Sequence, residues 1–192
     1  MTKKTPTYPI ETERLYLRPF QDDDLAELHA FYSRPDVARY LYWEAKELEG
    51  TRESLILKKK RTQLGETDSA VILAVILKES NVLIGEVMIF LRSTENRQGE
   101  IGFVFNPAYH GRGYATEAAK VALRLGFETA KLHRIYGRCD PRNTGSYKLM
   151  ERLGMRREAH FIHNEIFKGE WGDELHYAML ENEWRARYGS DT

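Results

Sequence analysis

Two glycines separated by one residue stand just ahead of a segment with helical character. The segment Tyr109–Thr116 reads Tyr-His-Gly-Arg-Gly-Tyr-Ala-Thr, so Gly111 and Gly113 flank Arg112. Glycines reach backbone conformations that let successive N–H groups point into one concavity, and a following helix adds unpaired N–H groups and the positive end of its dipole. His110 and Arg112 can add positive charge. The segment therefore predicts a phosphate-binding loop, whereas a bare Gly-x-Gly would indicate only a tight turn.

Three phosphate-binding motifs compete for this loop. A P-loop ends in Gly-Lys-Ser/Thr, which Arg112-Gly-Tyr-Ala does not supply. A dinucleotide fingerprint needs a third glycine where Thr116 stands, and its strand should lead straight into the loop, whereas 106–110 intervene here. The acetyl-CoA motif Gln/Arg-x-x-Gly-x-Gly/Ala aligns with His110–Ala115, with histidine in the first place. The loop therefore favours acetyl-CoA.

The elements that would hold this loop follow from hydrophobic periodicity and turn residues. We expect strands at 14–20, 69–78, 82–93, 100–105, 133–139, 157–167 and 174–180, and helices after Asp22 and at 37–41, 51–64, 114–130 and 144–153. The stripe Ala115, Ala118, Ala119, Ala122 and Gly126 would let the helix at 114–130 approach a sheet closely. This order predicts a mixed α/β fold whose sheet is mostly antiparallel, with one right-handed parallel βαβ unit at 100–139 and flanking helices.

Composition limits the classes of function. The 192 residues carry 29 Lys and Arg against 29 Asp and Glu, so charge gives no general case for nucleic acid or anionic lipid. Cys139 is the single cysteine, and 1–9 has no apolar stretch typical of a signal peptide. We expect a cytoplasmic protein without a membrane span or metal, organised as one domain at 10–188 between short tails at 1–9 and 189–192. The basic run 58–61 is interpreted as a solvated helix face.

Five segments in a fixed order resemble one family. They are Gly99–Phe103, Tyr109–Glu117, His133–Ile135, Asp140–Ser146 and Glu151–Met155. With them the chain resembles the GCN5-related N-acetyltransferases (GNAT), and in particular the branch of the ribosomal-protein alanine acetyltransferases RimJ and RimL. The resemblance implies a GNAT fold whose fourth and fifth strands splay apart. It also implies acetyl transfer from acetyl-CoA to a primary amine by direct attack, without a covalent enzyme intermediate and without a metal.

The resemblance also assigns cofactor-binding residues. Backbone groups of Val104 and Phe105 would pair with the pantetheine arm, N–H groups of 111–116 would hold the pyrophosphate, and Asn143 would contact the cofactor with Ser146 near the sulfur. The full predicted set is Phe103, Val104, Phe105, His110, Gly111, Arg112, Gly113, Tyr114, Ala115, Thr116, Asn143 and Ser146.

Catalysis needs a base and a proton donor, because an aliphatic amine with a pKa of about 10 arrives as an ammonium and the departing CoA thiolate takes up a proton. Glu100 is the candidate base, set against the alternative of an exposed carboxylate at a strand end. Glu86 is a weaker candidate, interpreted as a polar residue on the solvent face. Family members often place a tyrosine seven residues after the Asn143 position, where this chain has Met150, so Ser146 becomes the candidate donor.

The acetyl acceptor follows less directly from the sequence than the cofactor does. A protein N-terminus and a small-molecule amine both remain as acceptors, and aromatic residues such as Tyr40, Tyr42, Trp43 and Trp171 could line the acceptor pocket or simply pack. The alternative function is a catalytically weak or inactive module that binds and senses CoA. The edges of the final hairpin permit a homodimer without requiring one.

Overall fold

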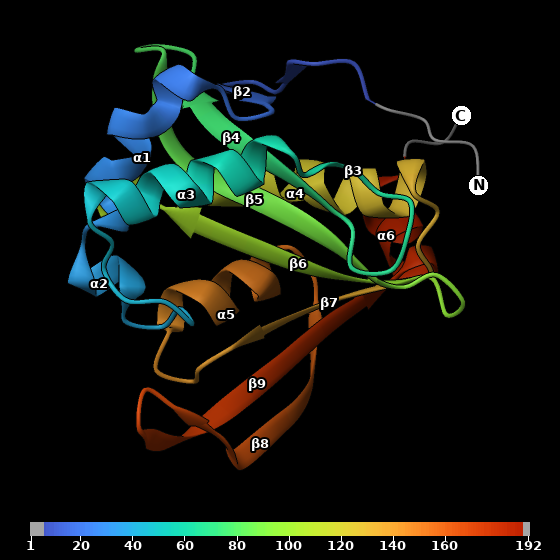
Figure 1. The fold of residues 1–192 in the computed structure, drawn as a ribbon. Coiled ribbons are helices and arrows are strands. Elements are labelled where there is room, and N and C mark those ends of the chain that lie inside the picture. The colour runs from blue at the N-terminus through green and yellow to red at the C-terminus, as the bar shows by residue number, and fades with distance from the viewer. Residues whose placement is uncertain (1–5, 190–192) are drawn as a thin grey trace.

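The fold is built on one twisted sheet, shown as a ribbon in Figure 1. The computed structural model describes residues 6–189, so 1–5 of the predicted N-terminal tail and 190–192 of the C-terminal tail lie outside the described residues. Across the described chain the strand order is β1-β2-β4-β5-β6-β7-β9-β8, with β3 beside β4. The strands are β1 (Ile10–Glu11), β2 (Leu15–Arg18), β3 (Thr62–Gln63), β4 (Ala70–Leu77), β5 (Val82–Ser93), β6 (Gln98–Phe105), β7 (Arg134–Cys139), β8 (Arg156–Phe167) and β9 (Glu170–Leu180).

The strand pairing confirms a mostly antiparallel sheet with one parallel unit. Neighbouring strands run antiparallel except β6 and β7, which pair in parallel. Strand β4 has the sequence Ala-Val-Ile-Leu-Ala-Val-Ile-Leu and is buried along its whole length. A strand reads as a continuous apolar run when both faces of its sheet are covered. The sheet therefore requires helices on both sides.

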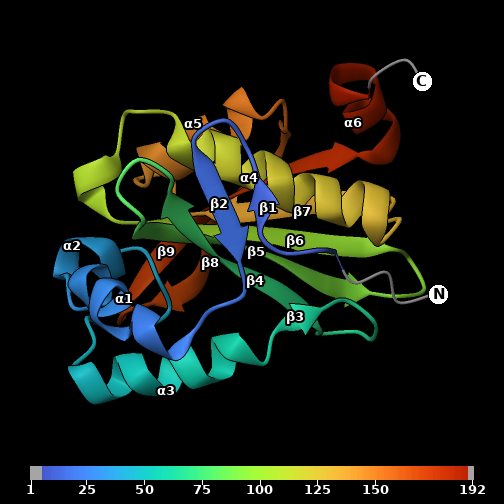
Figure 2. The ribbon, with the colours of Figure 1, turned by 90° about the horizontal axis from the view of Figure 1, so that it is seen from above.

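Helices cover the two faces as separate layers, which Figure 2 shows from above. The helices are α1 (Leu25–Tyr32), α2 (Pro35–Ala38), α3 (Leu48–Lys59), α4 (Tyr114–Arg124), α5 (Thr144–Arg152) and α6 (Glu181–Tyr188). On one face, α1 and α3 pack on Ile72, Ala74 and Ile76 of β4. On the other face, α4 packs on alternate residues of the same strand, such as Leu73 and Val75. No helix in 6–189 is long and apolar enough to span a membrane.

Close packing of α4 on the sheet follows from its small residues. Ala118, Ala119 and Ala122 are at most 2% exposed. The helix continues beyond α4 as a π-helical segment at Leu125–Thr129. A Cβ atom added to Gly126 there would lie 2.5 Å from Cδ1 of Ile135 on β7, closer than real Cβ atoms approach. The small-residue stripe thus places the N-terminus of α4, and the loop before it, firmly at the end of β6.

Some element boundaries differ from the expected ones. Helix α3 begins and ends earlier than 51–64, and α2 is shifted toward Pro35, which occupies its first position. The last hairpin turns on two residues, Lys168 and Gly169, rather than on 168–173. Both have positive φ, at 51° and 86°, as a tight hairpin turn requires. The sequence pattern does not predict helix α6, because its residues are largely charged. Trp184 anchors this helix by donating to Glu128 and stacking on Phe127.

Candidate active site

The parallel strands β6 and β7 separate after three pairs. They pair only at Gln98–Glu100 with Arg134–Tyr136, while β6 continues against β5 as far as Phe105. Within the described residues, 101–105 therefore have no strand partner on the β7 side. Backbone N–H and C=O groups on such an edge are free to bond an extended ligand. The separation of β6 from β7 confirms the expected splay of the fourth and fifth strands of the fold.

A cleft of about 1370 Å³ opens at this separation. It is lined by Glu100 and by all the predicted cofactor residues except Arg112, which makes a different contact through its carbonyl oxygen. The structure thus brings the start of α5 to the free edge of β6 and to the loop before α4, which follows β6 directly in the chain. An extended ligand bearing both amides and phosphates would meet both kinds of backbone donor there.

The glycine loop has the backbone geometry that the sequence predicted. Gly111 and Gly113 have φ of 77° and 81°, and Gly113 is the N-cap of α4. Nothing lies within 4 Å of a Cβ added to Gly111, so backbone conformation rather than space requires glycine there. His110 donates through Nε2 to the carbonyl oxygen of Phe105 over 3.1 Å, so its ring holds the end of β6 to the loop.

The start of α5 forms the opposite wall of the cleft. Asn143 is its N-cap, and Oδ1 accepts a hydrogen bond of 3.2 Å from the backbone N–H of Ser146. The thiol of Cys139, at the end of β7, lies beside Ser146, and burial raises the pKa of Cys139 to about 11. The thiol therefore stays protonated near neutral pH and is a poor nucleophile.

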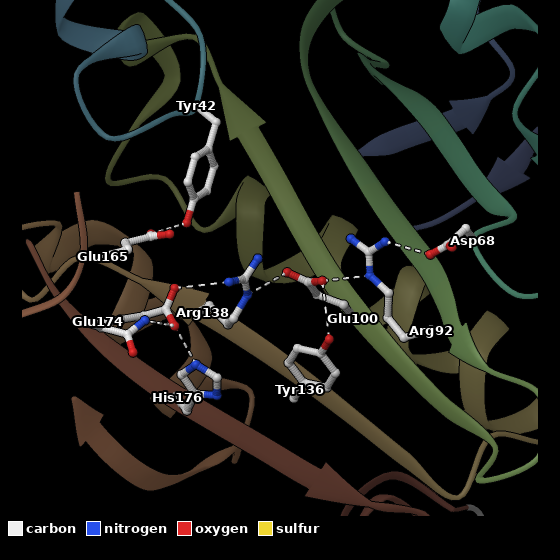
Figure 3. Close-up of polar contacts among 10 residues, drawn as sticks. Tyr42, Asp68, Arg92, Glu100, Tyr136, Arg138, Glu165, Glu174 and His176 are labelled. Atoms are coloured by element: carbon white, nitrogen blue, oxygen red, sulfur yellow. Dashed lines mark hydrogen bonds and ion pairs between the residues drawn. The ribbon is translucent and has the colours of Figure 1, made fainter. Parts of the chain in front are cut away.

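Glu100 is the centre of an ionic network across the sheet, drawn in Figure 3. One carboxylate oxygen accepts from Nε of Arg92 at 2.8 Å, and the other accepts from Nε of Arg138 at 3.1 Å. Arg138 also donates to Glu174 at 3.1 Å, and His176 lies 2.6 Å from that carboxylate. Partial burial alone would lower the pKa of Arg138, but Glu100 and Glu174 outweigh it and raise the pKa.

A smaller pocket of about 90 Å³ adjoins the cleft and shares Glu100, Arg138 and Cys139 with it. Its charged lining is strongly acidic, with one arginine, Arg138, against Glu100, Asp140, Glu165, Asp173 and Glu174. Arg142 pairs with Asp140, whereas Glu165 accepts from the hydroxyl of Tyr42 and forms no ion pair within 6–189. The pocket thus offers negative charge to whatever enters from the cleft.

Comparison with known proteins decides the family. The model of the acetyltransferase (GNAT) domain family matches residues 14–156. This chain belongs to the GNAT acetyltransferases. It is 39% identical over 176 residues to the uncharacterized N-acetyltransferase YnaD of Bacillus subtilis (strain 168), covering 91% of this chain and 98% of YnaD. It is 25% identical over 177 residues to spermidine N(1)-acetyltransferase of Escherichia coli (strain K12), covering 90% and 89% of the two chains.

A solved structure supports the same assignment. The acetyltransferase (GNAT family) from Bacillus anthracis superposes with a TM-score of 0.81 at 38% identity, covering 91% of this chain and 99% of that one. The protein is therefore an N-acetyltransferase, and GNAT enzymes take the acetyl group from acetyl-CoA and transfer it to amines. Of the described residues, no group of three His, Cys, Asp or Glu side chains could hold a metal ion.

Two sequence interpretations of charged residues in this GNAT domain are wrong. Glu86 does not lie on the solvent face but is 1% exposed, because α1 and α3 cover its side of the sheet. The hydroxyl of Tyr32 donates to one of its oxygens at 2.6 Å, and Nζ of Lys58 lies 2.7 Å from the other. Lys58 is therefore not part of a solvated face. Burial, together with the charge of Glu86, raises the pKa of Tyr32 well above its ordinary value.

Met150 occupies the position where many GNAT enzymes have a tyrosine. Its side chain is 1% exposed, and Sδ would lie 2.6 Å from a Cβ atom added to Gly137. Met150 therefore packs beneath β7 and cannot donate a proton. Arg138 and Glu174 could not be predicted as site residues, because an arginine and a glutamate on separate strands carry no local sequence motif.

Proposed function

We propose that this protein transfers acetyl from acetyl-CoA directly to a primary amine of a small, positively charged molecule. The observation that carries the proposal is the continuity of the cleft. At one end lie the free edge of β6 and the glycine loop, and at the other end lies the acid-rich pocket around Glu165. A phosphate-bearing donor would meet free backbone groups at the first end, and a cationic acceptor would meet acidic side chains at the second.

The residues present fit acetyl-CoA. The free edge at 103–105 would pair with the amides of the pantetheine arm, the loop at 111–116 would hold the pyrophosphate, and Asn143 would contact the arm from the opposite wall. When bound, acetyl-CoA supplies an acyl group activated as a thioester. Orientation of donor and acceptor in one cleft can itself lower the barrier substantially.

Proton transfer is assigned to residues of the cleft. Glu100 would take a proton from the incoming ammonium, directly or through water, while Arg92 and Arg138 hold its carboxylate in place. Ser146 would donate near the leaving sulfur. Direct attack is supported by Cys139, the one thiol of the chain, because burial keeps it protonated and unsuited to carry an acetyl group.

The acid-rich pocket supports a cationic small molecule over a protein N-terminus. A polyamine carries a second ammonium group, which Glu165 could bind because it has no cation of its own within 6–189. The spermidine acetyltransferase among the relatives is named for such an acceptor. The resemblance to the RimJ and RimL branch supplies the rival acceptor, a protein N-terminus with a single ammonium group.

Met150 supports a second candidate function, a module that binds CoA without turnover, because the usual proton donor is replaced by a buried thioether. One assay separates the candidates. Protein and acetyl-CoA are incubated with spermidine, with a monoamine or with a peptide bearing an N-terminal alanine, and free thiol is measured. We expect release that depends on spermidine. Release with the peptide alone would contradict the acceptor proposal, and thermal stabilisation by CoA without any release would favour the module.

A further inference from the structure

Glu117, one turn into α4, makes an unusually complete set of hydrogen bonds. Its carboxylate accepts from Oγ1 of Thr12 at 2.6 Å, from the backbone N–H of Arg14 at 2.8 Å and from Nε of Arg14 at 2.7 Å. Nη2 of Arg14 lies 2.7 Å from the same carboxylate, whose side chain is 14% exposed. The β1–β2 hairpin is thereby attached to a helix that begins about 100 residues later in the chain.

Arg14 also holds the glycine loop itself. Nη1 donates to the carbonyl oxygen of Arg112 at 2.9 Å, and the guanidinium lies 4.7 Å from the centre of the Tyr114 ring. A Cβ atom added to Gly113 would lie 3.4 Å from Nη2. One side chain thus contacts the residue before Gly113 and the residue after it, and it occupies the space beside Gly113.

The charges of Glu117 and Arg14 affect how the start of α4 would receive a phosphate. Glu117 is the one acidic residue in the first turn of α4, where its negative charge would oppose an incoming phosphate. Arg14 neutralises that charge while leaving the N–H groups of the helix end unengaged by the carboxylate. Burial alone would raise the pKa of Glu117, but the hydrogen bonds from Thr12 and Arg14 outweigh it and lower the pKa.

We propose that Thr12, Arg14 and Glu117 form a positioning clamp that presets the loop at 111–116 for the pyrophosphate of acetyl-CoA. The clamp rests on the cofactor site of the proposed function. Glu117 cannot bind a phosphate, so its effect on the loop passes through Arg14 to the carbonyl of Arg112. A loop held before binding loses less conformational freedom when the ligand arrives.

Two variants test the clamp. Glu117→Gln keeps the shape of the side chain but removes its charge, and Arg14→Lys keeps a charge but cannot bridge Glu117 and Arg112. Glu158→Gln is the matched control, because Glu158 also accepts two hydrogen bonds from an arginine, Arg134, but on β8 away from the loop. Calorimetry gives the Kd for CoA, and hydrogen exchange of the 112–116 amides in the free protein reports on the loop.

Acetylpantetheine, which lacks the phosphates, separates positioning from general damage to the fold. We expect both clamp variants to raise the Kd for CoA about tenfold, equivalent to about 1.4 kcal/mol, and to speed exchange in the loop. In both clamp variants, kcat/KM for acetyl-CoA should fall by the same factor, whereas kcat/KM for acetylpantetheine should not change. Glu158→Gln should change neither the Kd for CoA nor kcat/KM for either acetyl donor.

Two outcomes would overturn the clamp: an unchanged Kd for CoA in both variants, or equal losses with both acetyl donors. If the wild-type protein does not bind CoA at all, the proposed function fails and the clamp fails with it. If the wild-type protein binds CoA and the variants bind it equally well, only the clamp fails.

Discussion

At the scale of single residues, neighbours decide what a carboxylate can do. Glu100 and Glu86 lie on adjacent strands of the sheet, yet Glu100 faces two arginines, whereas Glu86 is buried with Tyr32 and Lys58. A base held between guanidinium groups is fixed in position but gives up a proton-accepting site to each donor. The role proposed for Glu100 therefore depends on geometry as much as on residue type.

Glu100→Gln tests the proposed base. We expect kcat at neutral pH to fall about a hundredfold or more, because the amide cannot accept the ammonium proton, while the Kd for CoA stays near its wild-type value. Steady-state kinetics across pH and calorimetry measure the two quantities. Glu158→Gln, in an arginine pair remote from the cleft, should leave kcat unchanged. Undiminished turnover by the Glu100 variant would exclude it as the base.

Glu165→Gln tests the acceptor pocket. The variant can still accept the hydroxyl of Tyr42 but no longer attracts a distant ammonium group. We expect the KM for spermidine to rise about two- to fivefold, as for a partly exposed ion pair, and the KM for a monoamine to stay unchanged. Added salt should reduce the difference between wild type and variant. Equal KM values for spermidine in the two proteins would show that the pocket does not bind the second charge.

At the scale of elements, α3 is attached to the sheet by a buried ion pair. Lys58 extends from the last turn of α3 to Glu86 on β5, and its Nζ lies 5.2 Å from the centre of the Tyr32 ring. Neither charge is well solvated, so each depends on the other. The buried residues of α3 are Thr51, Leu55 and Lys58, so the ion pair contributes much to the placement of the helix on the sheet.

Lys58→Met tests this attachment. Removing the lysine leaves Glu86 buried and without a cation, so we expect the free energy of unfolding to fall by about 3 kcal/mol or more. Lys59→Met is the matched control, because the adjacent lysine pairs with the exposed Asp22 and should cost less than about 1 kcal/mol. Urea denaturation measures both. Equal stabilities for the two variants would mean that the buried pair does not hold α3.

At the scale of the whole molecule, the cleft exists because β6 and β7 are held from opposite sides. β6 stays with β5 and the glycine loop, whereas β7 stays with β9 and the start of α5. The β1–β2 hairpin then fastens α4 through Glu117. The hairpin edge that permits a homodimer without requiring one is β8, the outer strand of the sheet, and no observation tests the dimer.

Low pH should weaken the attachment of the β1–β2 hairpin to α4 through Glu117. The pKa of Glu117 is lowered in the folded protein, because the bonds from Thr12 and Arg14 outweigh the effect of burial. Its contribution to stability is therefore complete above the ordinary pKa of glutamate and is lost as pH falls through the lower, folded value. We expect the free energy of unfolding to decline between about pH 5 and pH 3, and Glu117→Gln to decline less steeply. If the free energies of unfolding of wild type and Glu117→Gln declined equally between these pH values, Glu117 would not contribute to the loss of stability.

The sequence by itself determined the family, the sheet with its one parallel unit and most of the predicted cofactor residues that line the cleft. Those features depend on local patterns: strand runs, glycines before a helix and an alanine stripe, each within a short stretch of chain. The tertiary structure alone decided which charges meet. Arg138 with Glu100, Lys58 with Glu86 and Arg14 with Glu117 are pairs between distant segments. Sequence spacing carries no information on such pairs, because side chains become neighbours only when sheet register and helix packing place them together.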